Sequence, residues 1–125
     1  MILVFYIGRI LLGGYFIYSG VGHFKGLNGL VGYAQSKNVP FPKAAVILSG
    51  IMMIVGGLSV VLGFQMIIGM WLLVLFLIPT TMLMHNFWTA TDPADRMNSH
   101  IQFFKNVALI GALFLLISIP YLLIN

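Results

Sequence analysis

Charged side chains are scarce in this sequence of 125 residues, and acidic ones are nearly missing, with only two Asp or Glu. Charged residues make up 6% of the chain, against roughly 25% in an ordinary soluble domain. A water-soluble fold could not cover its surface with so few charges, and 61% of the chain is hydrophobic. The composition therefore predicts an integral membrane protein.

Cysteine is absent. Its absence excludes disulfides, thiol redox chemistry, cysteine-ligated iron–sulfur clusters and covalently attached c-type haem. Any electron transfer would need a bound cofactor or a redox partner subunit. The net charge is +4, but the sequence shows no basic run or polar face that could bind the phosphates of a nucleic acid, so we expect no nucleic-acid partner. The positive charge is better explained by helix orientation and anionic lipid headgroups in the surrounding bilayer.

Four segments are long and apolar enough to cross a hydrocarbon core of about 30 Å as helices. Strand alternation is absent, and open sheet edges are not tolerated in lipid. We therefore predict an all-α protein, an integral membrane four-helix bundle that forms a single transmembrane domain over residues 1–125. The first span lacks a basic leader and a cleavage site, so we interpret it as a retained helix. The predicted spans cover residues 2–22, 44–63, 66–85 and 101–124.

The connections differ in length. Residues 23–43 contain Leu27, Leu30, Val31 and Ala34 at helical spacing, which favours an interfacial amphipathic helix between spans one and two. An ordinary polar loop is the alternative. In the third connection, Asp92 precedes Pro93, and residues 99–102 match a capping box. This pattern predicts a short helical turn and then the start of span four.

Lysines and arginines are more frequent on one side of the membrane than on the other. Lys25, Lys37, Lys43, Arg96 and Lys105 lie in or near the first and third connections, whereas the opposite side has only Arg9, within span one. The positive-inside rule then places the long connections in the cytoplasm and both termini outside, in a bacterial-type inner membrane.

Small residues predict where helices approach closely. Gly13 and Gly20 share one face of span one with Arg9 and His23. Span two is expected to carry a second stripe of small residues, formed by Ser49, Gly56 and Gly63. Such a stripe would suit docking of a partner or of a second copy in a homo-oligomer.

Prolines within spans three and four predict kinks. Pro79 and Pro120 cannot donate a helical hydrogen bond, so carbonyls near Leu75 and Leu116 lose their partners. Thr80 or Thr81 is the local candidate to accommodate the first kink.

Several polar and aromatic residues are expected at one membrane face, because alternate spans run in opposite directions. They are His23, His85, Trp88, Lys105 and Asn106, together with Phe87 and His100. Hydrogen-bond donors beside aromatic rings suit a quinone headgroup or a small anion. The alternative is that these residues mark the headgroup belt, as in many membrane proteins.

Arg9 lies inside span one, and none of the spans contains a carboxylate to pair with it. A charge within the membrane is costly and is usually functional, although arginine can also snorkel to the interface. A buried role could use helix carbonyls, a polar ligand or a partner. Arg9 and His23 are about 21 Å apart along the helix, so they cannot hold one small substrate together.

The sequence predicts no metal site. The histidines lie near one surface, which disfavours a haem with two axial ligands inside the bundle. Met82, Met84 and His85 resemble a copper(I) ligand set, but methionine occurs in every span as apolar filler. Motifs of soluble enzymes are also missing.

The sequence resembles the DoxX family of small four-span membrane proteins along nearly its whole length. Each motif is short, and the order and spacing carry the resemblance. The motifs are Arg9 with the glycine-rich span and Gly22-His23-Phe24, Val39-Pro40-x-Pro42, His85-x-Phe87-Trp88, and Phe104-Lys105-Asn106 before Gly111. The acidic residue that the family often shows in span two is replaced here by the Ser49-Gly50 region.

The resemblance implies a component of a quinone-linked oxidoreductase system, at most one subunit of the enzyme, with quinone as the cofactor it favours. By motif match, the ligand-binding candidates are Arg9, His23, His85, Trp88, Lys105 and Asn106. A catalytic residue is not identified. The competing hypothesis is a non-enzymatic assembly factor or scaffold for partner membrane proteins, and a small oligomeric transporter is a third.

Overall fold

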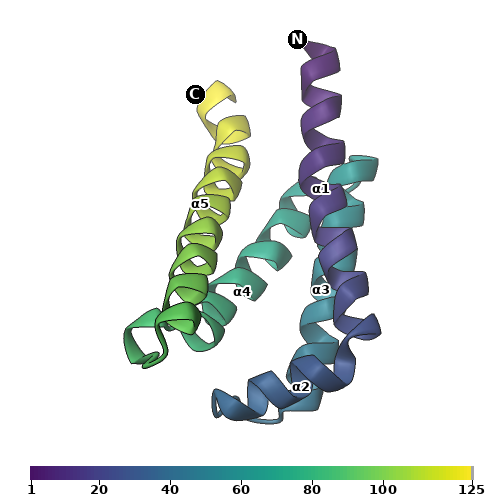
Figure 1. The fold of residues 1–125 in the computed structure, drawn as a ribbon. Helices are drawn as coiled ribbons and strands as arrows, with labels where there is room; N and C mark the ends of the chain where they lie inside the picture. The colour runs from purple at the N-terminus through teal and green to yellow at the C-terminus, as the bar shows by residue number, and fades with distance from the viewer. Residues whose placement is uncertain (125) are drawn as a thin grey trace. The chain divides into compact units, whose positions relative to one another are not determined.

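The computed structural model describes residues 1–124, and its regular elements there are helices (Figure 1). Four of them are long and apolar enough to cross a membrane. The predicted all-α class, with four long apolar helices and a short helix between spans one and two, is confirmed. The elements are α1 (Ile2–Lys25), α2 (Leu27–Ser36), α3 (Pro42–Leu62), α4 (Met66–Met84), the 3-10 turn η1 (Phe87–Thr89) and α5 (Pro93–Ile124).

The chain divides into two compact units, unit 1 over Met1–Phe76 and unit 2 from Leu77 onward. Helix α4 contributes its first half to unit 1 and its second half to unit 2. That the four spans form a single transmembrane domain stays a prediction.

In unit 1, α1 and α3 cross at paired glycines. A Cβ built on Gly13 would lie 2.6 Å from the carbonyl oxygen of Gly57, and one built on Gly57 would lie 2.6 Å from that of Gly13. Two turns along α1, a Cβ on Gly20 would lie 2.9 Å from the carbonyl oxygen of Gly50. The helices are therefore antiparallel and in backbone contact, and the predicted small-residue face of α1 is confirmed.

The glycines of the stripe predicted on span two pack closely, but they do so against two different neighbours within unit 1. Gly56 faces α4, where a Cβ would lie 2.8 Å from the Leu73 side chain. Gly63 faces Arg9 of α1 instead, and Ser49 donates a hydrogen bond within α3, to the Val46 carbonyl at 2.9 Å. Residues seven apart drift around a straight helix by about 20° per step, so one stripe can serve different neighbours.

Helix α2 confirms the predicted amphipathic segment as a helix, and it packs on α3 through the side of its buried Ala34. Its position at the headgroup level stays a prediction. The loop that follows contains two non-glycine residues with positive φ, Asn38 at 58° and Phe41 at 48°. Helix α3 then starts at Pro42, as expected for proline in a first helical turn.

Helix α5 begins at Pro93, so the prediction of a separate turn and a new start at the capping box is wrong. The Asp92 carbonyl accepts from the Arg96 amide at 2.9 Å, and the Asp92 Oδ2 accepts from the Asp95 amide at 3.4 Å. Because Asp92 and Pro93 already start the helix, Ser99 lies inside it and is buried.

The prolines lie within continuous helices, Pro79 in α4 and Pro120 in α5. Thr81 donates a hydrogen bond of 2.6 Å to the Leu77 carbonyl, one turn back in its own helix, and not to a carbonyl near Leu75. Whether Pro79 kinks the helix stays a prediction.

Candidate functional site

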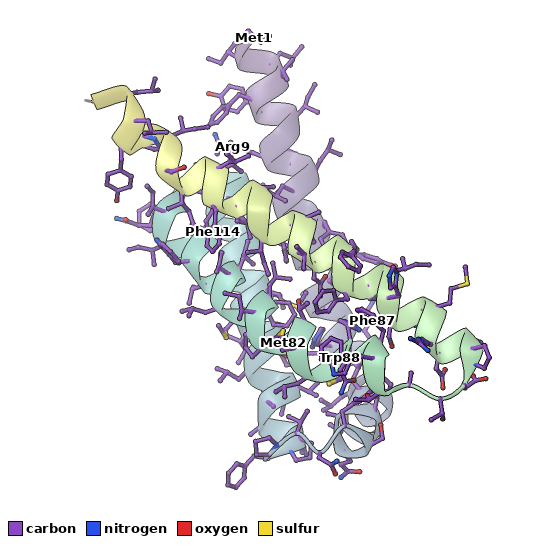
Figure 2. The ribbon with its side chains drawn as sticks, turned by 90° about the vertical axis from the view of Figure 1, so that its left-hand side faces the viewer. Met1, Arg9, Met82, Phe87, Trp88 and Phe114 are labelled. Atoms are coloured by element: carbon purple, nitrogen blue, oxygen red, sulfur yellow. The ribbon has the colours of Figure 1, made fainter. Side chains whose placement is uncertain are left out.

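Arg9, labelled in Figure 2, is half-buried on α1, and its side chain contacts the end of α3. Its Nε donates to the Val60 carbonyl at 2.9 Å, and its Nη2 donates to the Val61 carbonyl at 2.8 Å. The guanidinium also lies over the rings of Phe5 and Tyr6, at 5.6 and 5.2 Å from their centroids. Of the roles that the sequence left open for a buried arginine, the structure shows helix carbonyls as partners.

These two hydrogen bonds cap the C-terminus of α3. The last four carbonyls of a helix lack intrahelical donors, and that end carries partial negative charge. The Ser59 carbonyl accepts from the amides of Gly63 and Phe64, which leaves those of Val60 and Val61 for Arg9. Gly63 has φ +72°, and a Cβ there would collide with the guanidinium. The charge of Arg9 therefore faces a helix end and not a carboxylate side chain, since residues 1–76 contain no Asp or Glu.

His23 lies at the other end of α1, about 21 Å from Arg9 along the helix. Its Nδ1 is 3.0 Å from the Ser19 carbonyl, and its ring meets the edge of Phe76 with centroids 6.0 Å apart. Arg9 and His23 therefore belong to separate places in unit 1.

In unit 2, five aromatic side chains of η1 and α5 form a contiguous group, here called the aromatic cluster. Phe87 is at its centre, with centroids 4.8 Å from His100, 5.3 Å from Trp88 and 5.4 Å from Phe103. These contacts are edge-to-face, the geometry that ring quadrupoles favour. Figure 2 shows Phe87 and Trp88 at the turn that leads into α5. The members are Phe87, Trp88, His100, Phe103 and Phe104.

Part of the aromatic cluster is exposed. Trp88 is 50% exposed and Phe104 is 51% exposed, and His100 is exposed as well. The His100 ring lies 4.8 Å from that of Phe104. The cluster thus combines open ring faces for stacking with two N–H groups, on the indole and the imidazole, that can donate hydrogen bonds.

The remaining predicted residues of unit 2 lie around this cluster. His85 follows α4, and its carbonyl accepts from the Phe87 amide at 2.9 Å, which helps to set η1. Lys105 is on the exposed side of α5, where its Nζ donates to Gln102 Oε1 at 2.6 Å. Its neighbour Asn106 is buried, because successive helical residues point about 100° apart. Of the six predicted residues, only Trp88 is a member of the aromatic cluster.

His100 is the residue that the prediction left out of its candidates. Its spacing was visible in the sequence, because His100, Phe103 and Phe104 occupy positions i, i+3 and i+4 of one helix. The contact with Phe87 depends on the fold of the connection and could not be obtained from spacing.

Within residues 1–124, no three or more His, Cys, Asp or Glu side chains gather in a way that could hold a metal ion.

Comparison with known proteins identifies one family. The family model described as DoxX matches residues 4–86, from α1 to the residue before η1. The motifs at Trp88 and at Phe104–Gly111 therefore lie beyond the matched segment, although the sequence resemblance had extended to them. No curated protein and no solved structure matches the chain.

Proposed function

The chain belongs to the DoxX family of membrane proteins, and from that premise we propose that it is the quinone-binding membrane component of an oxidoreductase system. The observation that carries the proposal is the partly exposed aromatic cluster. A quinone ring stacks on Trp88 or Phe104, and the indole and imidazole N–H groups donate to its carbonyl oxygens.

The position of the aromatic cluster along α5 supports a quinone ligand. Helix α5 has 32 residues, whereas about 20 cross the hydrocarbon core. Its first turns carry Asp95 and Arg96, so they extend beyond the hydrocarbon. His100 and Phe104 then lie near the boundary, the level at which an amphipathic quinone headgroup meets water.

The chemistry favours a quinone over a small anion. A small anion would need cations aimed at one point, but Lys105 is engaged with Gln102 and is not a member of the aromatic cluster. In this proposal the chain binds and orients the quinone. The electrons come from a redox partner subunit, because the chain has no cysteine to ligate an iron–sulfur cluster or form a redox disulfide.

The scaffold hypothesis gains no support from the small-residue stripe of span two. Gly56 and Gly63 pack against α4 and Arg9 inside unit 1, so they do not offer a glycine face to a partner. A Gly56→Leu change would therefore disrupt the chain itself.

The two tryptophans allow a direct test. The Trp71→Phe variant retains Trp88 as its sole tryptophan, and the Trp88→Phe variant retains Trp71, which is 45% exposed on α4. A short-chain benzoquinone, titrated into each purified protein in mild detergent, should quench Trp88 fluorescence with saturation. Trp71 serves as the matched control, and we expect its quenching to rise linearly, as for quinone dissolved in the micelle.

A third protein, Trp71→Phe with His100→Ala, should lose saturation at Trp88 while keeping its melting temperature. His85→Ala in the same background tests the residue predicted from sequence. Linear quenching at both tryptophans, with no quinone in a solvent extract of the purified protein, would refute the quinone site.

A further inference from the structure

Positive charge is unbalanced in unit 1. Residues 1–76 contain Arg9, Lys25, Lys37 and Lys43 and no Asp or Glu, since both acidic residues of the chain are Asp92 and Asp95. Arg9 is engaged with α3 carbonyls, at the end of α1 opposite to Lys25. The three lysines therefore have no carboxylate side chain in their own unit.

The fold brings these lysines to one end of unit 1. Helix α1 ends at Lys25, and the antiparallel contact of Gly20 with Gly50 places the start of α3 at that same end. Figure 1 shows helix α2 at this same end, across the start of α3, on which it packs; Lys37 comes directly after the last residue of α2. Lys25 and Lys43 are exposed, and the Lys37 Nζ lies 5.6 Å from the Tyr33 ring centroid.

Phe41 adds an apolar contact to this end. It is 83% exposed, although it is a large aromatic residue. Its backbone has φ +48°, in the left-handed region that non-glycine residues seldom adopt, and prolines stand on both sides of it. Pro40 and Pro42 restrict the backbone of this loop, in which Phe41 stands two residues before Lys43.

We propose that Lys25, Lys37, Lys43 and Phe41 form a docking surface for anionic phospholipids. The ammonium groups bind the lipid phosphodiesters, and the Phe41 ring inserts among the upper acyl chains. Lysines together with an exposed aromatic ring suit a lipid, because a lipid presents both a phosphate and hydrocarbon chains. A soluble anion would bind the lysines but would make no apolar contact with the ring. This docking surface is independent of the aromatic cluster of unit 2.

Lipid binding to the purified full-length protein in detergent tests the proposal. Phosphatidylglycerol and phosphatidylcholine with the same acyl chains are added in equal amounts, and bound lipid is counted by native mass spectrometry. We expect phosphatidylglycerol to be preferred. Since a basic residue near an anionic surface contributes about fivefold in affinity, each lysine changed to glutamine should lower the preference by about that factor.

The controls separate charge at this surface from charge elsewhere. The triple variant K25Q/K37Q/K43Q should lose the preference, whereas K25R/K37R/K43R should keep it. R96Q/K105Q removes two cations of unit 2 and should bind phosphatidylglycerol as the unmodified protein does. Phe41→Ser should weaken the binding of both lipids, because it removes the apolar contact and leaves the charge of the lysines unchanged.

Three results would overturn the proposal. They are equal binding of the two lipids by the unmodified protein, an unchanged preference in the triple glutamine variant, and full competition by glycerol phosphate, which would indicate a site for a free phosphate. If the triple variant does not fold, the three single variants provide the test. An unchanged preference for phosphatidylglycerol in all three would overturn the proposed docking surface.

Discussion

At the scale of single residues, Arg9 shows how a charge can be retained in a membrane helix without an acidic partner. Two of its N–H groups bind the Val60 and Val61 carbonyls, and its charge faces the negative end of α3. Lysine could not reproduce this geometry, because only the planar guanidinium has donors placed side by side. The residue ties α1 to α3 across more than 50 positions of sequence.

We therefore expect Arg9→Gln to lower the free energy of unfolding by about 2 kcal/mol, since hydrogen bonds to a charged group are lost and two carbonyls lose their donors. Arg9→Lys should lower the free energy of unfolding by less than Arg9→Gln does. Thermal unfolding followed by tryptophan fluorescence in mild detergent measures the effect, with Arg96→Gln at an exposed position as control. A melting temperature unchanged in Arg9→Gln would mean that the cap contributes nothing.

At the scale of helices, the glycines of α1 divide into two groups. Gly13 and Gly20 touch α3, whereas Gly8, Gly14 and Gly22 have open space where a Cβ would stand. Lipid tails are as apolar as the side chains, so there is little hydrophobic drive between helices in a bilayer, and close backbone contact must supply the attraction. Only the first group can therefore hold the helix pair together.

Neighbouring residues give the matched test. Gly13→Ala places a methyl 2.6 Å from the Gly57 carbonyl oxygen and should cost about 1–3 kcal/mol through overpacking. Gly14→Ala meets no atom within 4 Å and should leave stability equal or slightly higher, because alanine favours the helix. Equal melting temperatures for both variants in detergent would contradict the α1–α3 contact.

At the scale of the whole molecule, the described residues include four helices long and apolar enough to cross a membrane. An even number of crossings predicts that both termini lie on the same side of it. The lysines of the first connection, which belong to the proposed lipid surface, also determine the expected orientation. Cytoplasmic loops are enriched in lysine and arginine, so we expect that connection in the cytoplasm.

A reporter active only in the cytoplasm should therefore be silent when fused to either terminus and active when inserted in the α2–α3 loop. Changing Lys25, Lys37 and Lys43 to glutamine should weaken this orientation. Active reporters at both termini would place the termini in the cytoplasm and contradict the orientation expected from the positive-inside rule. Opposite signals at the two termini would contradict the even number of spans.

Local patterns were enough to predict the helices and the family. Runs of about 20 apolar residues have to be helices in a bilayer, because the backbone has no other way to satisfy its polar groups. Helix α2 followed from its apolar spacing in the same way, and the DoxX motifs within residues 4–86 were legible without a structure. The start of α5 was missed because two capping signals compete, and Asp92 with Pro93 comes first.

The sequence by itself determined that this chain lies in a membrane and how many of its helices are long and apolar enough to cross it. Only the tertiary structure decided what Arg9 binds, which neighbours Gly56 and Gly63 each contact, and that the ring of His100 contacts that of Phe87. The physical reason is the range of the interactions. Helix formation and membrane insertion depend on neighbours within a few residues, whereas helix contacts depend on which faces two distant segments bring together.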